Sequence, residues 1–132
     1  MAFDPQSLFA NLAERERIHG HHSAEGQAIR MLSRALDGWS SGNLAGADVV
    51  ALCGQAVEDW LKRRLKRSPW SANSCTDLLA AAMAANLLTP SDARRLQVLC
   101  DLRGRSSAGE LNPFEIEHIL ETTIAIVEQR WS

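Results

Sequence analysis

The sequence predicts an all-α domain, and two observations support that prediction. The 132 residues include 19 Ala and 17 Leu, against 15 Val, Ile and Thr combined, and no Tyr. Ala and Leu favour helices, whereas β-branched and aromatic residues favour strands. In addition, apolar residues recur at spacings of three and four within segments bounded by capping residues and prolines. We expect six helices, four or five of them long enough to form a bundle.

The first two helices are bounded by local signals. Asp4-Pro5 places an N-cap before a proline at the first helical position, and the helix it opens ends near Gly20. Its apolar stripe is thin, so residues 1–22 are either an N-terminal helical arm that docks on a partner or a surface helix laid over the bundle. Ser23 caps a second helix, which ends at the break Ser40–Asn43.

The third helix has the most regular pattern, and it ends before Pro69, because the residue preceding a proline disfavours helical geometry. Its apolar face spans more than four turns. The residues of that face are Val49, Val50, Cys53, Ala56, Val57, Trp60, Leu61 and Leu65.

Three further starts complete the predicted fold. Ser74 with Asp77 indicates the cap of a fourth helix, and Thr89–Asp92 starts a fifth. A loop over Gly104–Leu111 precedes Asn112–Glu115, which has the pattern of a capping box for a last helix. No internal repeat or low-complexity linker divides the chain, so we expect one domain over residues 1–132.

Charge and targeting signals exclude several classes of protein. The net charge is −2 and the isoelectric point is near 6.1, so no whole-molecule field attracts nucleic acid or a membrane. The N-terminus has neither a basic region nor an apolar run typical of secretion, and no segment approaches the roughly 20 apolar residues that cross a bilayer. We expect a cytoplasmic protein with no membrane partner.

The cysteines are Cys53, Cys75 and Cys100, an odd number with wide spacing and no CxxC pair. This pattern argues against a disulfide framework. Cys53 and Cys100 lie among apolar neighbours and are expected to be small core residues. Cys75 lies at a helix start, which lowers a thiol pKa, but no base that would activate it is identifiable.

A basic run ends the third helix, where five of six residues are positively charged: Lys62, Arg63, Arg64, Lys66 and Arg67. Such a patch can contact phosphates and would then give salt-dependent binding. Alternatively, the cations complement the negative end of the helix dipole while their stems cover apolar surface. The sequence alone leaves both interpretations of the basic run open.

The histidines and the absence of standard catalytic motifs leave no metal or cofactor site. His19, His21 and His22 form an HGHH cluster, but a zinc site needs three or four ligands in tetrahedral array. We expect this segment to be a solvated loop and expect no metal and no cofactor. The sequence has no GxSxG, P-loop, GxGxxG or HExxH motif.

Two segments resemble the HEPN superfamily (higher eukaryote and prokaryote nucleotide-binding domains). QAVEDWLK, which contains Gln55 and Glu58, is similar to the QAxExxLK stretch on the family's central helix. LRGRSSAG, which contains Arg103, Arg105 and Ala108, is similar to the family's LRNxxxHG segment. The order and spacing of the two segments extend the resemblance over roughly residues 24 to 130.

The resemblance implies an up-and-down bundle of four to five helices that forms a homodimer. In active members an arginine and a histidine in an R-x4-6-H arrangement cleave RNA across the dimer, the arginine stabilising charge on the phosphate and the histidine assisting proton transfer. Other members lack the nuclease activity and act with small nucleotidyltransferases in toxin–antitoxin or defence systems.

The chain departs from this pattern at the acid–base position. Arg103 matches the family's arginine, but the histidine position falls on Ala108, whose methyl group transfers no proton. We therefore expect no catalytic residue, and a non-catalytic, dimeric module that binds a protein or RNA partner. The residues assigned to that binding are Arg103, Arg105, Lys62, Arg63 and Arg67. The alternative is a metal-independent endoribonuclease in which His118 or Glu110 replaces the missing histidine.

The dimer surface has two sets of candidates. Trp39 and Trp60, on the second and third helices, are candidate large apolar anchors, since aromatic residues are enriched at interfaces. Both are equally well explained as core residues, because Trp60 lies on the apolar face of the third helix. The N-terminal helix is the other candidate contact.

Overall fold

The structure is a computed structural model that describes residues 3–20, 23–66, 74–103 and 112–131. These residues form helices and short connections, with no strand among them, which confirms the predicted all-α class. No helix within the described ranges is long and apolar enough to cross a membrane. The helices, in chain order, are α1 (Pro5–His19), α2 (Ala24–Ser40), α3 (Gly46–Arg64), α4 (Cys75–Ala84), α5 (Pro90–Arg103) and α6 (Pro113–Trp131).

The predicted helix starts are confirmed at five positions. At each one, a side-chain oxygen accepts a hydrogen bond from the backbone N–H three residues later, at 2.8 to 3.2 Å, which satisfies one of the free donors of the first turn. The capping residues are Asp4, Ser23, Ser74, Thr89 and Asn112. Only α3 starts without such a bond, at Ala45.

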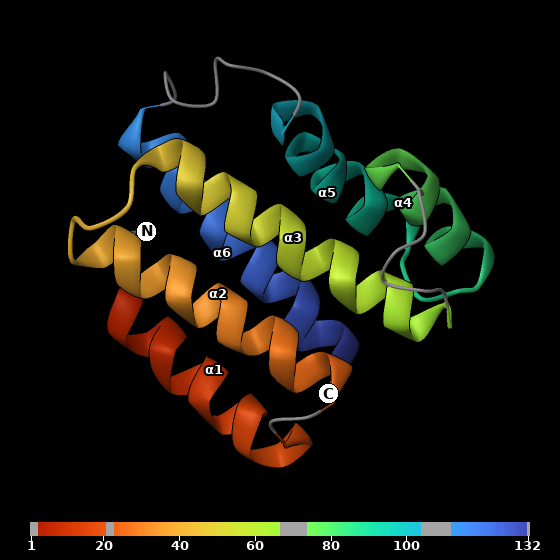
Figure 1. Cartoon of the computed structure of the whole chain (residues 1–132), viewed down its shortest axis with the longest axis horizontal. Helices are drawn as coiled ribbons and strands as arrows, with labels where there is room; N and C mark the ends of the chain where they lie inside the picture. The colour runs from red at the N-terminus through yellow and green to blue at the C-terminus, as the bar shows by residue number, and fades with distance from the viewer. Residues whose placement is uncertain (1–2, 21–22, 67–73, 104–111, 132) are drawn as a thin grey trace.

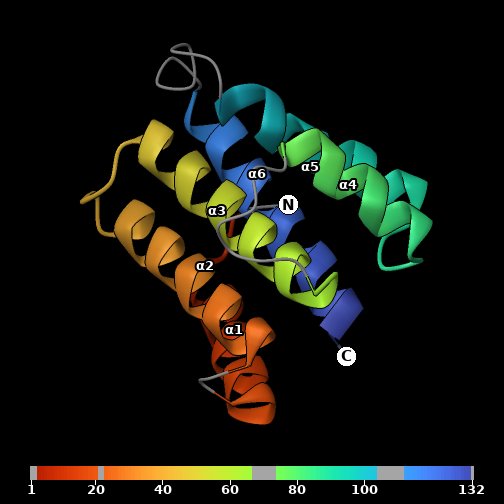
Figure 2. The same ribbon diagram turned by 45° about the vertical axis from the view of Figure 1, so that its right-hand side comes forward.

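Helix α3 is the centre of the molecule. Both views place it between α2 and the α4–α5 pair, with α6 behind it (Figures 1 and 2). Its predicted apolar face is buried except for Leu65, which follows the end of the helix and is partly buried. Trp60, with 2% of its surface exposed, is the largest side chain in the core. Removing such a face from water is the main stabilising contribution of each packed helix.

Helix α1 lies against α2 and also touches α6 (Figure 1). Leu12 is its one fully buried residue among those described, which agrees with the thin stripe seen in the sequence. The turn into α2 is tight, because a Cβ at Gly26 would lie 1.8 Å from the carbonyl oxygen of Gly20. In this chain α1 is a surface helix of the bundle.

Helices α4 and α5 form an antiparallel pair that is joined by a disulfide between Cys75 and Cys100. The expectation of no disulfide, and of Cys100 as a free core residue, was wrong. The antiparallel pairing brings the first residue of α4 to the last turn of α5, with the two Cα atoms 5.5 Å apart. Cys53 is the free cysteine and is buried, as predicted.

Candidate functional site

The residues of the first family-like segment lie on α3. Gln55 and Glu58 are partly buried, and the Gln55 side-chain amide donates a hydrogen bond of 2.8 Å to the Asp59 carboxylate one turn later. This pairing fixes side chains along the α2-facing edge of α3. In the second segment, Arg103 is the last residue of α5 and only its backbone is described, while Arg105, Ala108 and Glu110 lie outside the described residues.

The basic end of α3 turns back onto α2. The Arg63 guanidinium donates to the side-chain oxygen of Gln27, and that of Arg64 lies 3.3 Å from the Glu25 carboxylate. Lys62 is partly buried, and Arg67 lies outside the described residues. At least two cations of the predicted patch therefore hold α3 to α2, Arg63 by a hydrogen bond and Arg64 by an ion pair. A surface ion pair contributes about 1 kcal/mol or less.

The structure adds two arginines that sequence reasoning missed. Arg30 and Arg34, one turn apart on α2, line a shallow depression of about 300 Å³ together with Arg63 and Asp59. Arg63 already donates to Gln27, and Arg30 lies 3.7 Å from the Glu16 carboxylate. Because the Asp59 carboxylate offsets more of the charge, the depression has little positive charge left for an anionic ligand. The signal in the sequence was the spacing of four between two arginines on a helix with an apolar opposite face.

Two sizeable hollows lie between α5 and α6. Two adjoining hollows, of about 520 and about 500 Å³, share Val98, His118 and Ile119 in their walls, and we call them together the α5–α6 groove. Arg95 and Glu121 lie toward one end of the groove, and the remaining wall residues are Leu99, Thr122, Thr123, Ala125, Leu102, Asn112, Phe114 and Glu115.

The groove has an exposed apolar rim. The Phe114 side chain is 82% exposed and Val98 is 46% exposed. Among the described residues the other exposed large apolar side chains are Ile18 and Met83, which lie on α1 and α4. Two exposed apolar side chains at the edge of a hollow are typical of an interaction surface, whereas single ones scattered over a surface are not.

His118 is the one described histidine in the groove. It is exposed on α6 and lies in the wall of both hollows. Leu102 lies in the wall of the second hollow, and it is the residue before Arg103. The fold thus brings His118 to the part of α5 that carries the family-like arginine, although the two are 15 residues apart in the sequence.

The other sequence candidates form no site. Trp60 is core, and the partly buried Trp39 donates an indole hydrogen bond of 3.2 Å to the Glu117 carboxylate, which joins α2 to α6. In the described ranges no three His, Cys, Asp or Glu side chains gather closely enough to hold a metal ion. His21 and His22 of the HGHH cluster lie outside those ranges.

Comparison with protein-family models, with curated proteins and with solved structures finds no match to this chain.

Proposed function

We propose that this protein is a non-catalytic, HEPN-like helical module that forms a two-fold homodimer through the α5–α6 groove. The observation that supports this most strongly is the position of Phe114, 82% exposed at the edge of a hollow of about 500 Å³. Leaving an aromatic side chain of this size in water forgoes roughly 2 kcal/mol of burial.

A second copy of the chain suits this surface because the surface is self-complementary. In a two-fold contact, the same patch of each protomer meets its counterpart, so a projection and a hollow on one patch fill each other. Phe114 is the projection and the α5–α6 groove is the hollow. The groove also carries charges of both signs, Arg95 on α5 and Glu121 on α6, which can pair across a two-fold axis.

The oligomeric state over the micromolar range tests this proposal. Sedimentation velocity should show a concentration-dependent dimer of the wild-type protein. In the double variant Phe114→Ser/Val98→Ser the dissociation constant of the dimer should rise about tenfold or more, because the apolar centre of an interface contributes most of its affinity. The matched control is Ile18→Ser/Met83→Ser, which removes two exposed apolar side chains elsewhere. A wild-type protein that stays monomeric, or equal weakening by both pairs, would contradict the proposal.

The resemblance supplies the wider setting of the proposal. HEPN-like modules without nuclease activity act with nucleotidyltransferase-type proteins in toxin–antitoxin or defence systems, so the resemblance implies a protein partner of that class. RNA is the weaker partner class, because Arg63 and Arg64 are already engaged with side chains of α2.

The second candidate function is a metal-independent endoribonuclease with a relocated acid–base residue. It is favoured by the placement of His118 and Leu102 in one hollow, next to the end of α5 where Arg103 lies. In this function Arg103 neutralises charge on the scissile phosphate and His118 moves the proton.

Cleavage of RNA by the purified protein with chelator present tests the second function. A nuclease of this kind loses activity in both Arg103→Ala and His118→Ala, by about 100-fold or more, whereas Arg94→Ala is a matched control on the same helix. No cleavage by a stable wild-type dimer would exclude this function and support the non-catalytic module.

A further inference from the structure

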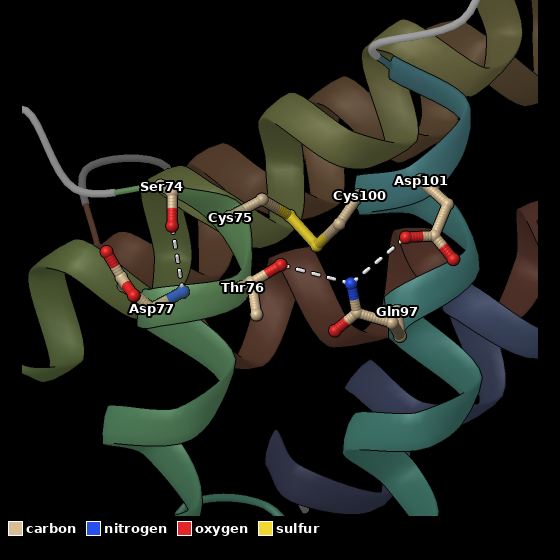
Figure 3. The surroundings of a disulfide bond; sticks show 7 residues. All are labelled: Ser74, Cys75, Thr76, Asp77, Gln97, Cys100 and Asp101. Carbon is tan, nitrogen blue, oxygen red and sulfur yellow. Dashed lines mark hydrogen bonds between the residues drawn. A yellow bond between two sulfur atoms is a disulfide. The ribbon is translucent and has the colours of Figure 1, made fainter.

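The disulfide joins two helix ends of opposite electrostatic character. Cys75 is the first residue of α4, directly after the cap Ser74, and Cys100 lies in the last turn of α5 (Figure 3). Neither cysteine is fully buried, although Cys100 packs against the edge of the core. Cystines of this kind differ from the buried disulfides of small secreted domains, which resist reduction.

The two sulfur atoms are not equivalent as leaving groups. Free backbone N–H groups at the start of α4 stabilise a thiolate at Cys75, as helix N-termini do. The end of α5 and the neighbouring Asp101 carboxylate disfavour a thiolate at Cys100. The Asp77 carboxylate in the first turn of α4 reduces the stabilisation of Cys75, and the Ser74 hydroxyl accepts from the Asp77 N–H.

Beside the disulfide, a polar side-chain link joins the two helices. Gln97 donates from its amide to the Thr76 hydroxyl at 3.0 Å and to the Asp101 carboxylate at 3.2 Å (Figure 3). This link is exposed, and hydrogen bonds of this kind contribute about 1 kcal/mol. Breaking the disulfide therefore removes the covalent link between the two helices and leaves weaker links such as this one.

The same segment of α5 forms a wall of the α5–α6 groove. Val98, Leu99 and Leu102 lie in that wall, on either side of Cys100 in the sequence. A displacement of the last turn of α5 would therefore move Leu102, which is part of the groove wall.

We propose that Cys75–Cys100 is a thiol–disulfide exchange site whose substrates are small thiols and dithiol proteins, and that its oxidised form holds the α5–α6 groove in the shape that binds a second copy. The exchange reaction is independent of the proposed function, whereas the effect of the exchange on dimer formation rests on the proposed function.

The reaction balances with the thiol as reductant. An external thiolate attacks the Cys100 sulfur, the sulfur–sulfur bond breaks, and Cys75 leaves as a thiolate. The protein now carries a mixed disulfide at Cys100. A second thiol, or the second sulfur of a dithiol, attacks the external sulfur and releases Cys100, which takes a proton. Two electrons have passed to the protein, and the reductant has become a disulfide.

Timed reaction with reduced glutathione tests the exchange. The protein is quenched with a maleimide, and peptide mass spectrometry locates glutathione and maleimide on each cysteine. We expect the mixed disulfide on Cys100 about tenfold more often than on Cys75, because the thiol of lower pKa leaves faster. The buried Cys53 is the internal control and should stay unlabelled until urea is added. A disulfide that resists excess glutathione in the native protein, or adducts found mainly on Cys75, would overturn the assignment.

Sedimentation of the oxidised and reduced forms tests the coupling to the groove. Reduction of the wild type should raise the dissociation constant of the dimer about tenfold. The variant Cys75→Ser/Cys100→Ser should dimerise as weakly as the reduced wild type, and adding a reductant should not change its affinity. Circular dichroism establishes that the reduced form stays helical. If exchange occurs and dimer affinity is the same in both forms, the coupling is wrong. If the protein is monomeric in both forms, the proposed dimer fails while the exchange site stands.

Discussion

The pairs α2–α3 and α5–α6 are both made of helices adjacent in the sequence, yet one pair is closed and the other open. Both helices of the closed pair carry small buried residues, and small residues allow helix backbones to approach closely: Ala28, Ala35 and Gly38 on α2, and Gly54 and Ala56 on α3. A Cβ at Gly38 would lie 2.3 Å from the Leu44 side chain, so the closeness extends to the connection. Between α5 and α6 the wall residues include the larger Val98, Leu102 and Ile119, and the groove remains.

This difference indicates how a helical domain divides its apolar residues between folding and binding. The distance between packed helices depends on the side chains at their contact, so a pair with small residues buries its apolar face completely. In the open pair, α5 also packs against α3 and α4, its Leu96 is buried, and Val98 is left at the rim. The closed pair stabilises the fold, and the open pair leaves surface for a partner.

The largest expected effect compares one core residue of the closed pair with one rim residue of the open pair. Leu32→Ala, at a position with no exposed surface, should lower the free energy of unfolding by about 3 to 5 kcal/mol, because it removes buried methyl groups and leaves a cavity. Val98→Ala, 46% exposed, should change it by less than about 1 kcal/mol. Urea denaturation of both variants at a concentration where the protein is monomeric measures the difference. Similar losses would remove the distinction between the two pairs.

The second effect concerns the covalent link that holds the open side. In the double variant Cys75→Ser/Cys100→Ser the free energy of unfolding should fall by about 3.5 kcal/mol, the loop-closure entropy of a disulfide that spans 25 residues. Urea denaturation of the oxidised wild type and of the variant gives the value. The reduced wild type is the control and should match the variant. An unchanged midpoint in the reduced protein would mean that the α4–α5 pair needs no covalent link.

Local features of this fold were predictable, and the features that distinguish the open side were not. The caps at Ser74 and Asn112 depend on residues three positions apart, so the sequence alone indicates them. The disulfide depends on a pairing of α4 with α5 over 25 residues, and an odd cysteine count argues against it. The α5–α6 groove depends on the distance between two helices. The spacing of apolar residues such as Leu99 and Ile119 predicts which face of each helix is buried, but it does not predict that distance. The dimer and the HEPN-like function remain predictions.

The third effect uses the buried thiol of the closed side. Burial raises the pKa of Cys53 from 9.0 to about 12. The unfolded chain therefore loses this proton at lower pH than the folded chain does, and the free energy of unfolding falls as the pH rises above 9. Between about pH 8 and about pH 10 the loss from this thiol should be about 1.4 kcal/mol.

Urea denaturation at the two pH values measures this loss, in the Cys75→Ser/Cys100→Ser background so that no disulfide is attacked at high pH. Adding Cys53→Ala should remove the loss specific to this thiol, while the pH dependence from other groups stays. If both proteins lose the same free energy, Cys53 titrates in the folded state as it does in the unfolded chain, and the core around α3 is more open than its burial indicates.

The smallest effect compares one cap on each side of the molecule. Asn112 starts α6 at the groove, where its oxygen accepts from the Glu115 N–H at 2.9 Å and its amide donates to the Glu115 carboxylate at 2.7 Å. Ser23 starts α2, where its hydroxyl accepts from the Gly26 N–H at 2.8 Å and donates to the Gly20 carbonyl at 3.0 Å. Asn112→Ala and Ser23→Ala should each lower the free energy of unfolding by about 1 kcal/mol. Only Asn112→Ala should also weaken the dimer, because Asn112 and Phe114 share one wall of the groove.

Thermal unfolding measures the stability of the two variants, and sedimentation measures their dimer affinity. Equal dimer affinities would show that the start of α6 lies outside the interface.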